Sequence, residues 1–413
     1  MNQAVGVSMT TDENTPKDEW GHALLDAVAR RGSGHTPDKK HPEYWDGSIK
    51  WISLQDSAQL DTLYIEDTAA TITTEGIKNS SAVLHQKGTV VLSRDAGVGK
   101  SAIMAADMAV SQHFMAWTCG QRLNNHFLYY WLQSKKPEFE RIANGNTIKT
   151  IGLPYFKELA LPLPPLEEQK RIASALTDID TLIGSLDQLI VKKRGIRQAA
   201  IHQLLTGERR LPGFSGKWQK ILLDALAYSL KGSSLSKTDL SPDGTKKCIL
   251  YGELFTTYGR VIHRVYGRTD SSNGTPSIAG DVLLPGSTTT TGIDLASASA
   301  VLEEGVLLGG DINIIRQRKR DSFNPAFLAR YLTSVAAKDI AERAQGITII
   351  HLYGRDLKSL LINLPPQEEQ SAIAGILSDL DSELDALEAH RKKALHIKQG
   401  MMQELLTGRT RLV

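Results

Sequence analysis

The chain has 413 residues, of which 41% are hydrophobic and 23% charged, and this composition indicates a globular protein of two or three domains. No apolar run approaches the roughly 18–20 residues of a membrane span, and the formal net charge of +2 argues against binding a polyanion by bulk charge alone. The cysteines, Cys119 and Cys248, lie far apart, so no zinc finger is expected and a reducing cytoplasm fits. The histidines form no His-x3-His pair backed by an acid, so no metal site is predicted.

The N-terminal part of the chain predicts a tail followed by a globular domain. Residues 1–19 are polar and lack the apolar segment of a signal peptide, so we expect a disordered tail there. Residues 20–163 form the first predicted domain. Within it, RDAGVGKS from Arg94 to Ser101 resembles a phosphate-binding loop, but that motif needs glycine where Arg94 stands. We therefore interpret this stretch as a Gly-rich turn and not as a nucleotide site.

Residues 164–211 predict one long helix. A Pro-Pro pair stands at its start, where a missing N–H costs nothing, and Glu167 and Glu168 place negative charge at the positive end of the helix dipole. The sequence Leu-Leu-Thr-Gly closes it, because Gly207 can adopt the left-handed conformation of a helix C-cap. Neither this Pro-Pro pair nor the later one is followed by the aromatic residue that an amino-methyltransferase loop requires, so no catalytic residue is predicted.

The same segment recurs at residues 365–412. With a constant offset of 201 and no gap, 20 of 48 positions are identical. Both copies carry apolar residues at alternating spacings of four and three, which is the seam of a coiled coil. Each helix therefore predicts a long partner, and the obvious partner is the other copy; the alternative is that each helix packs along its own globular domain. The predicted seam is Ile172, Leu176, Ile179, Ile183, Leu186, Ile190, Ile373, Leu377, Leu380, Leu384 and Leu387.

The repeat extends into the segments between the helices. The pattern Trp-x3-Leu-Leu-Asp-Ala begins at Trp20 and again at Trp218, whereas residues 30–124 and 228–324 share almost nothing. We therefore predict an α+β protein with two mixed α/β domains, separated by two long helices that form an antiparallel coiled coil, in a pseudo-twofold tandem repeat. The predicted boundaries are a tail at 1–19, domains at 20–163 and 212–364, and helices at 164–211 and 365–413. Two copies that share their helices and domain borders but differ in their interior sequences are typical of a protein whose two domains bind two different ligands.

Several of these stretches resemble the specificity subunits of type I restriction-modification systems. The resemblance is carried by SGHTP from Ser33, PEYWDG from Pro42, the helix entries at Pro164 and Pro365, and the Leu-Leu-Thr-Gly exits. It implies a cytoplasmic, non-catalytic subunit that reads a split double-stranded DNA target, with one half-site for each domain. It also implies two methyltransferase subunits that bring S-adenosylmethionine, and motor-nuclease subunits that bring ATP hydrolysis with Mg²⁺; no cofactor is expected on this chain.

Base edges are read by Arg, Lys, Asn and Gln, and phosphates are held by hydroxyls and basic groups, so polar Gly-rich loops supply the DNA-binding candidates. Each candidate could equally be a solvated surface residue. In the first domain the candidates are Ser33, His35, Thr36, Lys39, Tyr44, Arg94, Lys100 and Lys149. In the second they are Lys231, Ser233, Tyr251, Arg260, Arg264, Thr289 and Arg316. The tryptophans Trp45, Trp51 and Trp218 are interpreted as core residues.

The resemblance and the repeat together predict the shape of the target. A spacer of 39 residues, 167–205, spans about 58 Å of helix, and an asymmetric target with an unread gap of about 5–8 base pairs is expected. Asp178, Asp180, Asp379 and Asp381 are predicted to lie on free helix faces that dock the methyltransferases. Two alternatives remain open, namely a coiled-coil assembly protein with protein-binding domains and an autonomous DNA-modifying enzyme.

Overall fold

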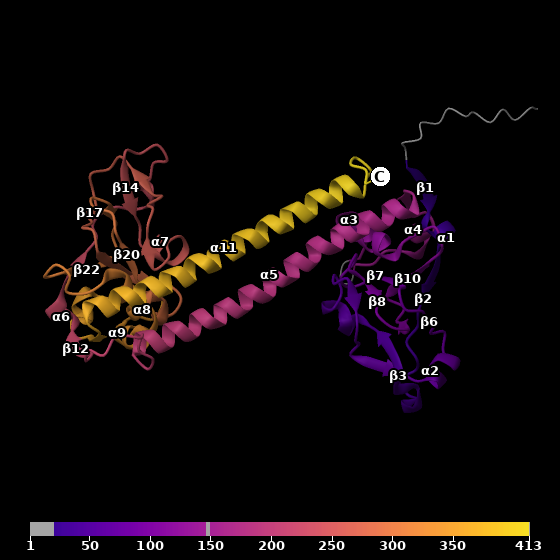
Figure 1. Cartoon of the computed structure of the whole chain (residues 1–413), viewed down its shortest axis with the longest axis horizontal. Coiled ribbons are helices and arrows are strands. Elements are labelled where there is room, and N and C mark those ends of the chain that lie inside the picture. The colour runs from indigo at the N-terminus through magenta and orange to yellow at the C-terminus, as the bar shows by residue number, and fades with distance from the viewer. Residues whose placement is uncertain (1–19, 146–148, 413) are drawn as a thin grey trace, which may run out of the picture. The chain divides into compact units, whose positions relative to one another are not determined.

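A computed structural model describes residues 20–145 and 149–412, so the predicted tail lies outside the described residues. The chain divides into two compact units, residues 1–186 with 390–413 and residues 187–389. Each unit combines a globular body with the beginning of one long helix and the end of the other (Figure 1). We call residues 20–163 the first body and residues 218–364 the second body.

The first body is built on two mixed sheets. Within its described residues, a five-stranded sheet has the order β2-β10-β7-β8-β4 and a four-stranded sheet the order β5-β3-β9-β6. The larger sheet consists of β2 (Ala29–Ser33), β10 (Phe114–Cys119), β7 (Val90–Ser93), β8 (Ser101–Met104) and β4 (Tyr64–Ile65). The smaller consists of β5 (Ala70–Ile72), β3 (Trp45–Ile52), β9 (Met108–Val110) and β6 (Leu84–His85). Separately, β1 (Gly21–Leu24) pairs with β11 (Ala160–Leu163), next to the start of the long helix.

The second body repeats this topology. Among its residues, all described, the five-stranded sheet has the order β13-β22-β18-β20-β15 and a four-stranded sheet the order β16-β14-β21-β17. The first consists of β13 (Ala227–Lys231), β22 (Ile312–Gln317), β18 (Asp281–Pro285), β20 (Ser299–Val301) and β15 (Val261–Ile262), and the second of β16 (Arg268–Thr269), β14 (Lys246–Ile249), β21 (Leu307–Leu308) and β17 (Thr275–Pro276). Two short pairs complete it, β12 (Gln219–Leu222) with β24 (Leu361–Leu364) and β19 (Ser287–Thr288) with β23 (Ile350–His351).

The two bodies agree in register as well as in strand order. Ser33 pairs with Met115 in the first body and Lys231 with Asn313 in the second, so both members of the pair are shifted by the same 198 positions. The parallel pairs also correspond, β3 with β9 to β14 with β21, and β4 with β8 to β15 with β20. Two interiors that share almost no sequence therefore fold in one way.

Each body buries its large sheet under a helix. In the first body α3 (Asn125–Ile142) contacts β7 and β8, and in the second α8 (Pro325–Ser334) contacts β18 and β20. Both helices begin with an asparagine cap, because the side chains of Asn124 and Asn324 accept hydrogen bonds from the backbone N–H groups three residues later, at Phe127 and Phe327. The remaining helices are short: α1 (Leu25–Val28), α2 (Thr74–Lys78), α4 (Leu153–Lys157), α6 (Leu223–Leu226), α7 (Glu253–Thr256), α9 (Ala337–Arg343) and α10 (Gly354–Leu357).

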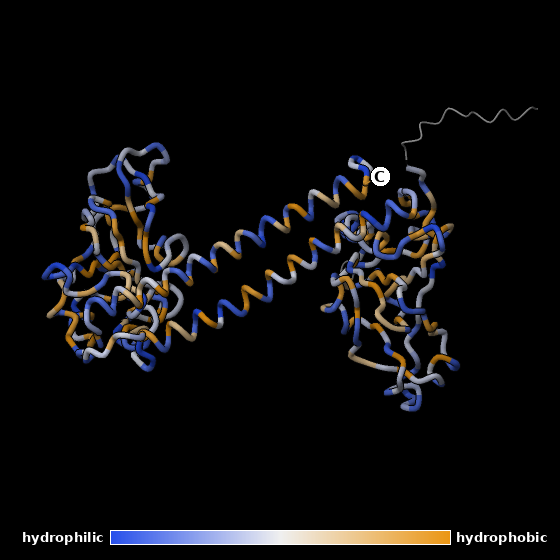
Figure 2. Tube along the Cα trace, in the orientation of Figure 1, coloured by the Kyte–Doolittle hydropathy of each residue, from blue (hydrophilic) through white to orange (hydrophobic). Residues whose placement is uncertain are grey.

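The two predicted long helices are present as α5 (Leu166–Thr206) and α11 (Gln367–Leu405), of 41 and 39 residues. Hydrophobic residues recur along both of them between hydrophilic ones (Figure 2). α5 ends directly before the predicted Gly207, which has a φ of 77°, and α11 ends at Leu405, three residues before the predicted Gly408, which has a φ of 74°. A side chain at Gly207 would meet the ring of Trp218 at 3.4 Å, and one at Gly408 would meet that of Trp20 at 3.2 Å, so space as well as φ favours glycine there.

The predicted seam is buried over part of its length and half-buried over the rest. On α5, Ile172 and Leu176 are fully buried, and they pack into the core of the first body with Phe127. Ile373 and Leu377 on α11 do the same in the second body. The alternative that each helix packs along its own domain is therefore correct for the first turns, and the pairing of the helices holds further along. Ile183, Leu186 and Ile190 are buried, and Ile179, Leu380, Leu384 and Leu387 are half-buried.

Ion pairs within each unit show that the helices run antiparallel. In the first unit Glu168 and Asp180 on α5 bind Arg411, beyond the end of α11, and Lys398, respectively. From the first pair to the second, the residue number rises along α5 and falls along α11, so the two helices run in opposite directions. In the second unit Glu369 and Asp381 on α11 bind Arg210 and Arg197 in the same order.

Glu168 and Glu369, near the starts of the two long helices, do more than place negative charge at a helix dipole, because each also accepts several hydrogen bonds from other parts of its unit. Glu168, with 3% of its side chain exposed, accepts hydrogen bonds from Arg411 at 2.8 Å, from the indole of Trp20 at 3.2 Å and from the backbone of Leu412 at 3.1 Å. The guanidinium of Arg411 also lies 5.6 Å above the Trp20 ring. This contact, which we call the clasp, joins the exit of α11 to the entry of α5 and to the first body.

The second unit contains an equivalent clasp. Glu369, whose side chain is fully buried, accepts from Arg210 at 2.5–2.6 Å and from the indole of Trp218 at 3.2 Å. All three residues are the repeat partners of Glu168, Arg411 and Trp20. These recurring residues join each helix exit to a helix entry.

The prediction that Asp180 and Asp381 lie on free helix faces is wrong. Asp180 accepts from the Tyr130 hydroxyl at 3.0 Å and pairs with Lys398 at 2.6 Å. Asp381 is held by Arg197 and, at 2.9 Å, by Arg330. The sequence pattern did not reveal these contacts, because the partners of both aspartates lie far away in the sequence. Their neighbours Asp178 and Asp379 are exposed.

Candidate nucleic-acid interface

Each body has an open cleft at the edge where its two sheets meet. The cleft of the second body, which we call the second cleft, has a volume of about 1830 Å³. It is lined by the residues after β13 and β14, by the turn that follows β19 and by the loop before β22. Four predicted DNA-binding residues come together there, namely Lys231, Ser233, Tyr251 and Thr289, and all four are exposed.

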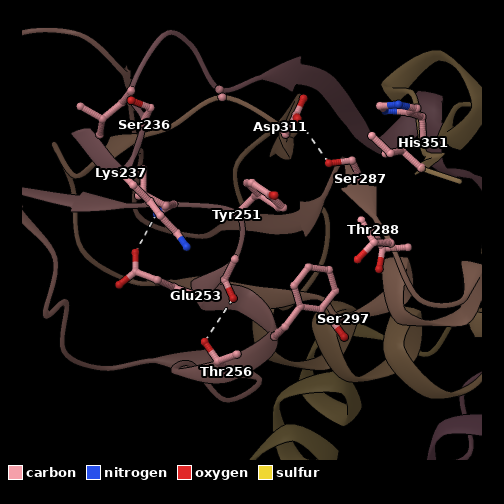
Figure 3. Close-up of a pocket in the computed structure, with 18 of the residues that line it drawn as sticks. Ser236, Lys237, Tyr251, Glu253, Thr256, Ser287, Thr288, Ser297, Asp311 and His351 are labelled. Carbon is pink, nitrogen blue, oxygen red and sulfur yellow. Dashed lines mark hydrogen bonds between the residues drawn. The ribbon is translucent and has the colours of Figure 1, made fainter. Parts of the chain in front are cut away.

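The floor of the second cleft is held by polar contacts. Asp311 accepts a hydrogen bond from the Ser287 hydroxyl at 3.2 Å (Figure 3). Asp311 also pairs with Lys231 at 3.4 Å. Glu253 accepts from the backbone N–H of Leu250 at 2.7 Å, and burial raises the pKa of Glu253 above its usual value. The rim carries hydroxyls, aromatic rings and amines, including Lys237, Phe255 and Thr256, which sequence reasoning did not select. Such a lining suits phosphates and base edges.

The cleft of the first body, which we call the first cleft, is smaller, at about 710 Å³. The predicted residues Thr36 and Lys39 line it. Two tryptophans form one wall, with Trp45 edge-on to Trp51 at 5.2 Å between ring centroids. Trp51 is 6% exposed and donates its indole N–H to the carbonyl of His35, in agreement with a core role. The polar lining that sequence reasoning missed consists of Asp46, Ser53, Gln55, Ser111, Gln112 and His113.

A chain of hydrogen bonds crosses the first cleft. The Thr36 hydroxyl donates to Gln112 Oε1 at 2.7 Å, Gln112 Nε2 lies 3.4 Å from His113 Nε2, and His113 Nδ1 lies 2.7 Å from Asp95. Asp95 also accepts from the Thr150 hydroxyl. Burial opposes the charge of Asp95, but the hydrogen bonds from Thr150 and His113 and the charge of Arg94 outweigh it and lower the pKa of this carboxyl.

The two clefts lie at the same place in the shared fold. The residue after β2 or β13 is glycine in both, because its Cα approaches another backbone closely. A Cβ on Gly34 would fall 1.6 Å from the carbonyl oxygen of Val110, and one on Gly232 would fall 1.9 Å from that of Gly309. This glycine continues the Trp20 and Trp218 repeat at the same offset of 198, and that alignment could have located both clefts from the sequence.

Other predicted residues have structural partners. Arg316 makes a two-pronged ion pair with the buried Asp281, at 2.7 and 2.9 Å. Arg260 donates to the carbonyl of Ala298 and the hydroxyl of Thr333, and burial lowers its pKa. These two arginines are therefore engaged within the second body, and their contact with DNA stays a prediction.

The Gly-rich stretch from Arg94 to Ser101 is a turn between the antiparallel strands β7 and β8, as interpreted, whereas a phosphate-binding loop leads into a helix. Lys100 there donates to the carbonyl of Ser57 at 2.9 Å, and Arg94 is 3.5 Å from Asp95. Outside the clefts lie Ser33, which donates to the carbonyl of Phe114, and His35, Tyr44, Lys149 and Arg264; the last stacks over Tyr266. Contact of each with DNA stays a prediction.

Comparison with known proteins identifies the family. The model for the type I restriction modification DNA specificity domain matches residues 17–192 and again residues 216–396. The chain belongs to this family. As in the sequence repeat, one match falls on each body together with the larger part of the helix that follows it. The chain is thus a DNA-binding specificity subunit with two target-recognition domains.

Relatives cover the chain to different extents. A specificity subunit of the type I restriction enzyme MjaIX from Methanocaldococcus jannaschii is 31% identical over 170 residues, which are 41% of this chain and 39% of that protein. The MjaVIII specificity subunit of the same organism is 22% identical over 380 residues, or 86% of each chain.

Solved structures confirm the fold. The S subunit from M. genitalium matches 95% of this chain and 98% of its own, with a TM-score of 0.59 and 17% identity. The HsdS subunit from Thermoanaerobacter tengcongensis matches 97% and 100%, with a TM-score of 0.51 and 16% identity. Within residues 20–145 and 149–412, no helix is both long and apolar enough to cross a membrane.

Proposed function

We propose that each body reads one half of a bipartite DNA target through its cleft, and that the two half-sites differ. The observation that carries this proposal is the pair of clefts at equivalent positions of one topology, with different linings. One fold presenting two sets of polar groups is what two readers of two sequences require.

The two linings differ in chemistry. The first cleft presents the amides of Gln55 and Gln112 together with His113. The second presents a row of hydroxyls from Ser287 to Thr290, with Lys231 and Lys237. Because amides and hydroxyls make different hydrogen bonds with base edges, the target is asymmetric and not palindromic.

The spacer helices set the distance between the half-sites. We propose an unread gap of about 5–8 base pairs, from readers placed about one helical turn apart on one face of the duplex. Inserting one heptad into both α5 and α11, so that their pairing is kept, should lengthen the gap and leave both half-sites unchanged. A gap of unchanged length would contradict the helices' role as a spacer.

The helices also carry surface for partner subunits. Leu182, Leu189 and Ile196 recur every seven residues on α5 and are 38–43% exposed. On α11 the exposed apolar residues are Ile376, Leu395 and Ile397. Exposed apolar side chains on a helix suit a protein interface, and we propose that those of α5 and α11 dock two methyltransferase subunits. These would bring S-adenosylmethionine, and motor-nuclease subunits would bring ATP and Mg²⁺, while this chain performs no catalysis.

The proposal is tested by co-expressing the chain with its methyltransferase and sequencing the methylated DNA. We expect a split, non-palindromic motif that is absent when the methyltransferase is expressed alone. A continuous or palindromic motif would contradict the proposal. Mass measurement of the purified complex should give two methyltransferases for each copy of this chain, and a stable one-to-one complex at saturation would contradict the docking scheme.

A further inference from the structure

The amide of Gln112 is exposed in the first cleft and is held in one orientation. Gln112 stands two residues before β10, on the loop that brings His113 beside Asp95. Its Oε1 accepts from the hydroxyl of Thr36 at 2.7 Å, which comes from the loop after β2. Its Nε2 lies 3.4 Å from the Nε2 of His113. Three loops therefore contribute to the position of one side chain.

Hydrogen-bond chemistry decides which end of the amide faces which neighbour. Asp95 is a hydrogen-bond acceptor, so the Nδ1 of His113 donates to it, and when the imidazole carries no second proton its Nε2 is an acceptor. An amide N–H facing that nitrogen makes a bond, whereas an amide oxygen there would place two acceptors together. The hydroxyl of Thr36 has a proton to give to Oε1. Both neighbours thus favour the same orientation.

This arrangement leaves one donor and one acceptor of Gln112 for a ligand. The oxygen has a second lone pair, and the nitrogen has a second proton, both in the plane of the amide. In the major groove an adenine offers the complementary pair, N6–H and N7, and glutamine reads adenine through these two bonds. The exposed Lys39 on the same cleft provides a charge for the phosphate backbone.

The second body lacks this group. Gly310 stands two residues before β22, where Gln112 stands before β10, and a Cβ built on it meets no atom within 4 Å. Asp311 follows it in the place of His113. The corresponding space in the second cleft is therefore open, in keeping with its larger volume.

We propose, on the basis of the function proposed above, that Gln112 reads an adenine in the half-site of the first body, and that Thr36 and His113 position its amide. Gln112 is a specificity-determining residue in this scheme, and Thr36 is a positioning residue. The half-site of the second body is read without an equivalent amide.

The test is the methylated motif of the full chain co-expressed with its methyltransferase. Gln112→Ala should lower discrimination at one A·T pair of one half-site by about tenfold and leave the other half-site unchanged. Gln112→Glu should move the preference at that position from adenine to cytosine, because a carboxylate accepts from the cytosine amino group. Gly310→Gln, the matched control in the second body, should alter only the other half-site.

Variants of Thr36 distinguish a role in positioning the Gln112 amide from a general effect on folding. Thr36→Val should weaken discrimination at the same base pair, and Thr36→Ser, which keeps the hydroxyl, should restore it. An unchanged motif in Gln112→Ala, a change in both half-sites, or loss of all methylation with unchanged melting would overturn the proposal. A wild-type motif that is not split would instead overturn the function on which it rests, so the two failures are distinguishable.

Discussion

In the first body the residue before β10 is His113, which binds the carboxylate of Asp95; in the second body the same position before β22 is Asp311, which accepts from Ser287. The carboxylate lies two residues after β7 in the first body and one residue before β22 in the second, and in each body it contacts the side chain at the other of these two positions. Gly34 and Gly232, by contrast, are the same residue in the same close approach. The comparison teaches that the close backbone contacts at these glycines fix the fold. The polar contacts around the clefts can change without altering the fold, and such changes would alter the bases that each cleft recognises.

The helix seam provides the largest expected effect. Leu186 is 6% exposed, and its repeat partner Leu387 is half-buried. Leu186→Asp should lower the free energy of unfolding by about 3–5 kcal/mol, because it buries an unpaired charge, and Leu387→Asp by less. Urea denaturation measures both. Leu182→Asp on the exposed face is the control, with about 0.5 kcal/mol or less expected. Equal, small effects in all three variants would contradict the seam.

The two clasps should give the second largest loss of stability. Glu168→Ala should cost about 2–4 kcal/mol, because it removes a buried acceptor from Arg411 and Trp20, and Glu369→Ala should cost about the same. Glu167→Ala is the matched control, since its side chain is 71% exposed and pairs only with Lys170 in the described contacts. Thermal melting of the three variants compares them. A Glu168 variant as stable as the Glu167 variant would show that the clasp adds nothing.

The aspartate pair distinguishes the two units. Asp381 neutralises Arg330, whose side chain is 6% exposed, whereas Asp180 accepts from the neutral hydroxyl of Tyr130. Asp381→Ala should therefore cost about 2–3 kcal/mol, since it leaves a buried charge, and Asp180→Ala about 1 kcal/mol. The difference between the two unfolding free energies is the measurement. A larger loss in the Asp180 variant would mean that the burial of Arg330 does not matter.

A smaller effect is expected in the pH dependence of stability, through the carboxylate of Glu168. The hydrogen bonds from Arg411 lower the pKa of Glu168, and burial opposes them only in part. This carboxylate therefore stabilises the fold above the unfolded pKa of about 4.3, and the contribution is lost as pH falls through the lower folded value. The difference in Tm between the wild type and Glu168→Gln should shrink between about pH 5 and pH 3. A constant difference would show that the charge on Glu168 has no part in it.

Sequence patterns predict the helices well because their signals are local. The Pro-Pro entry, the seam spacing and the glycine caps at Gly207 and Gly408 are each recognised from residues within a few turns of one another. The shared sheet topology was out of reach, because buried strands such as β7 and β8 carry no alternating pattern. The clasps were missed for another reason, since Glu168 and Arg411 are 243 positions apart.

The candidate site shows the same division. Lys231, Ser233, Tyr251 and Thr289 were selected because they lie in polar loops, and the structure brings them together in one cleft, while their contact with DNA stays a prediction. Arg316 looked equally suitable, but no sequence pattern reveals that Asp281 lies buried beside it. Gln112 gave no signal, because an uncharged side chain in a loop gains its meaning from neighbours such as Thr36 on other loops.

The most direct test of two independent readers is the exchange of residues 30–124 for those of another specificity subunit, followed by sequencing of the methylated motif. The exchange replaces the first cleft, with Thr36 and Gln112, and leaves the frame of Trp20, Glu168 and Arg411 in place. We predict that one half-site changes to that of the donor, while the other half-site and the gap stay the same. A change in both half-sites, or in neither, would contradict the account.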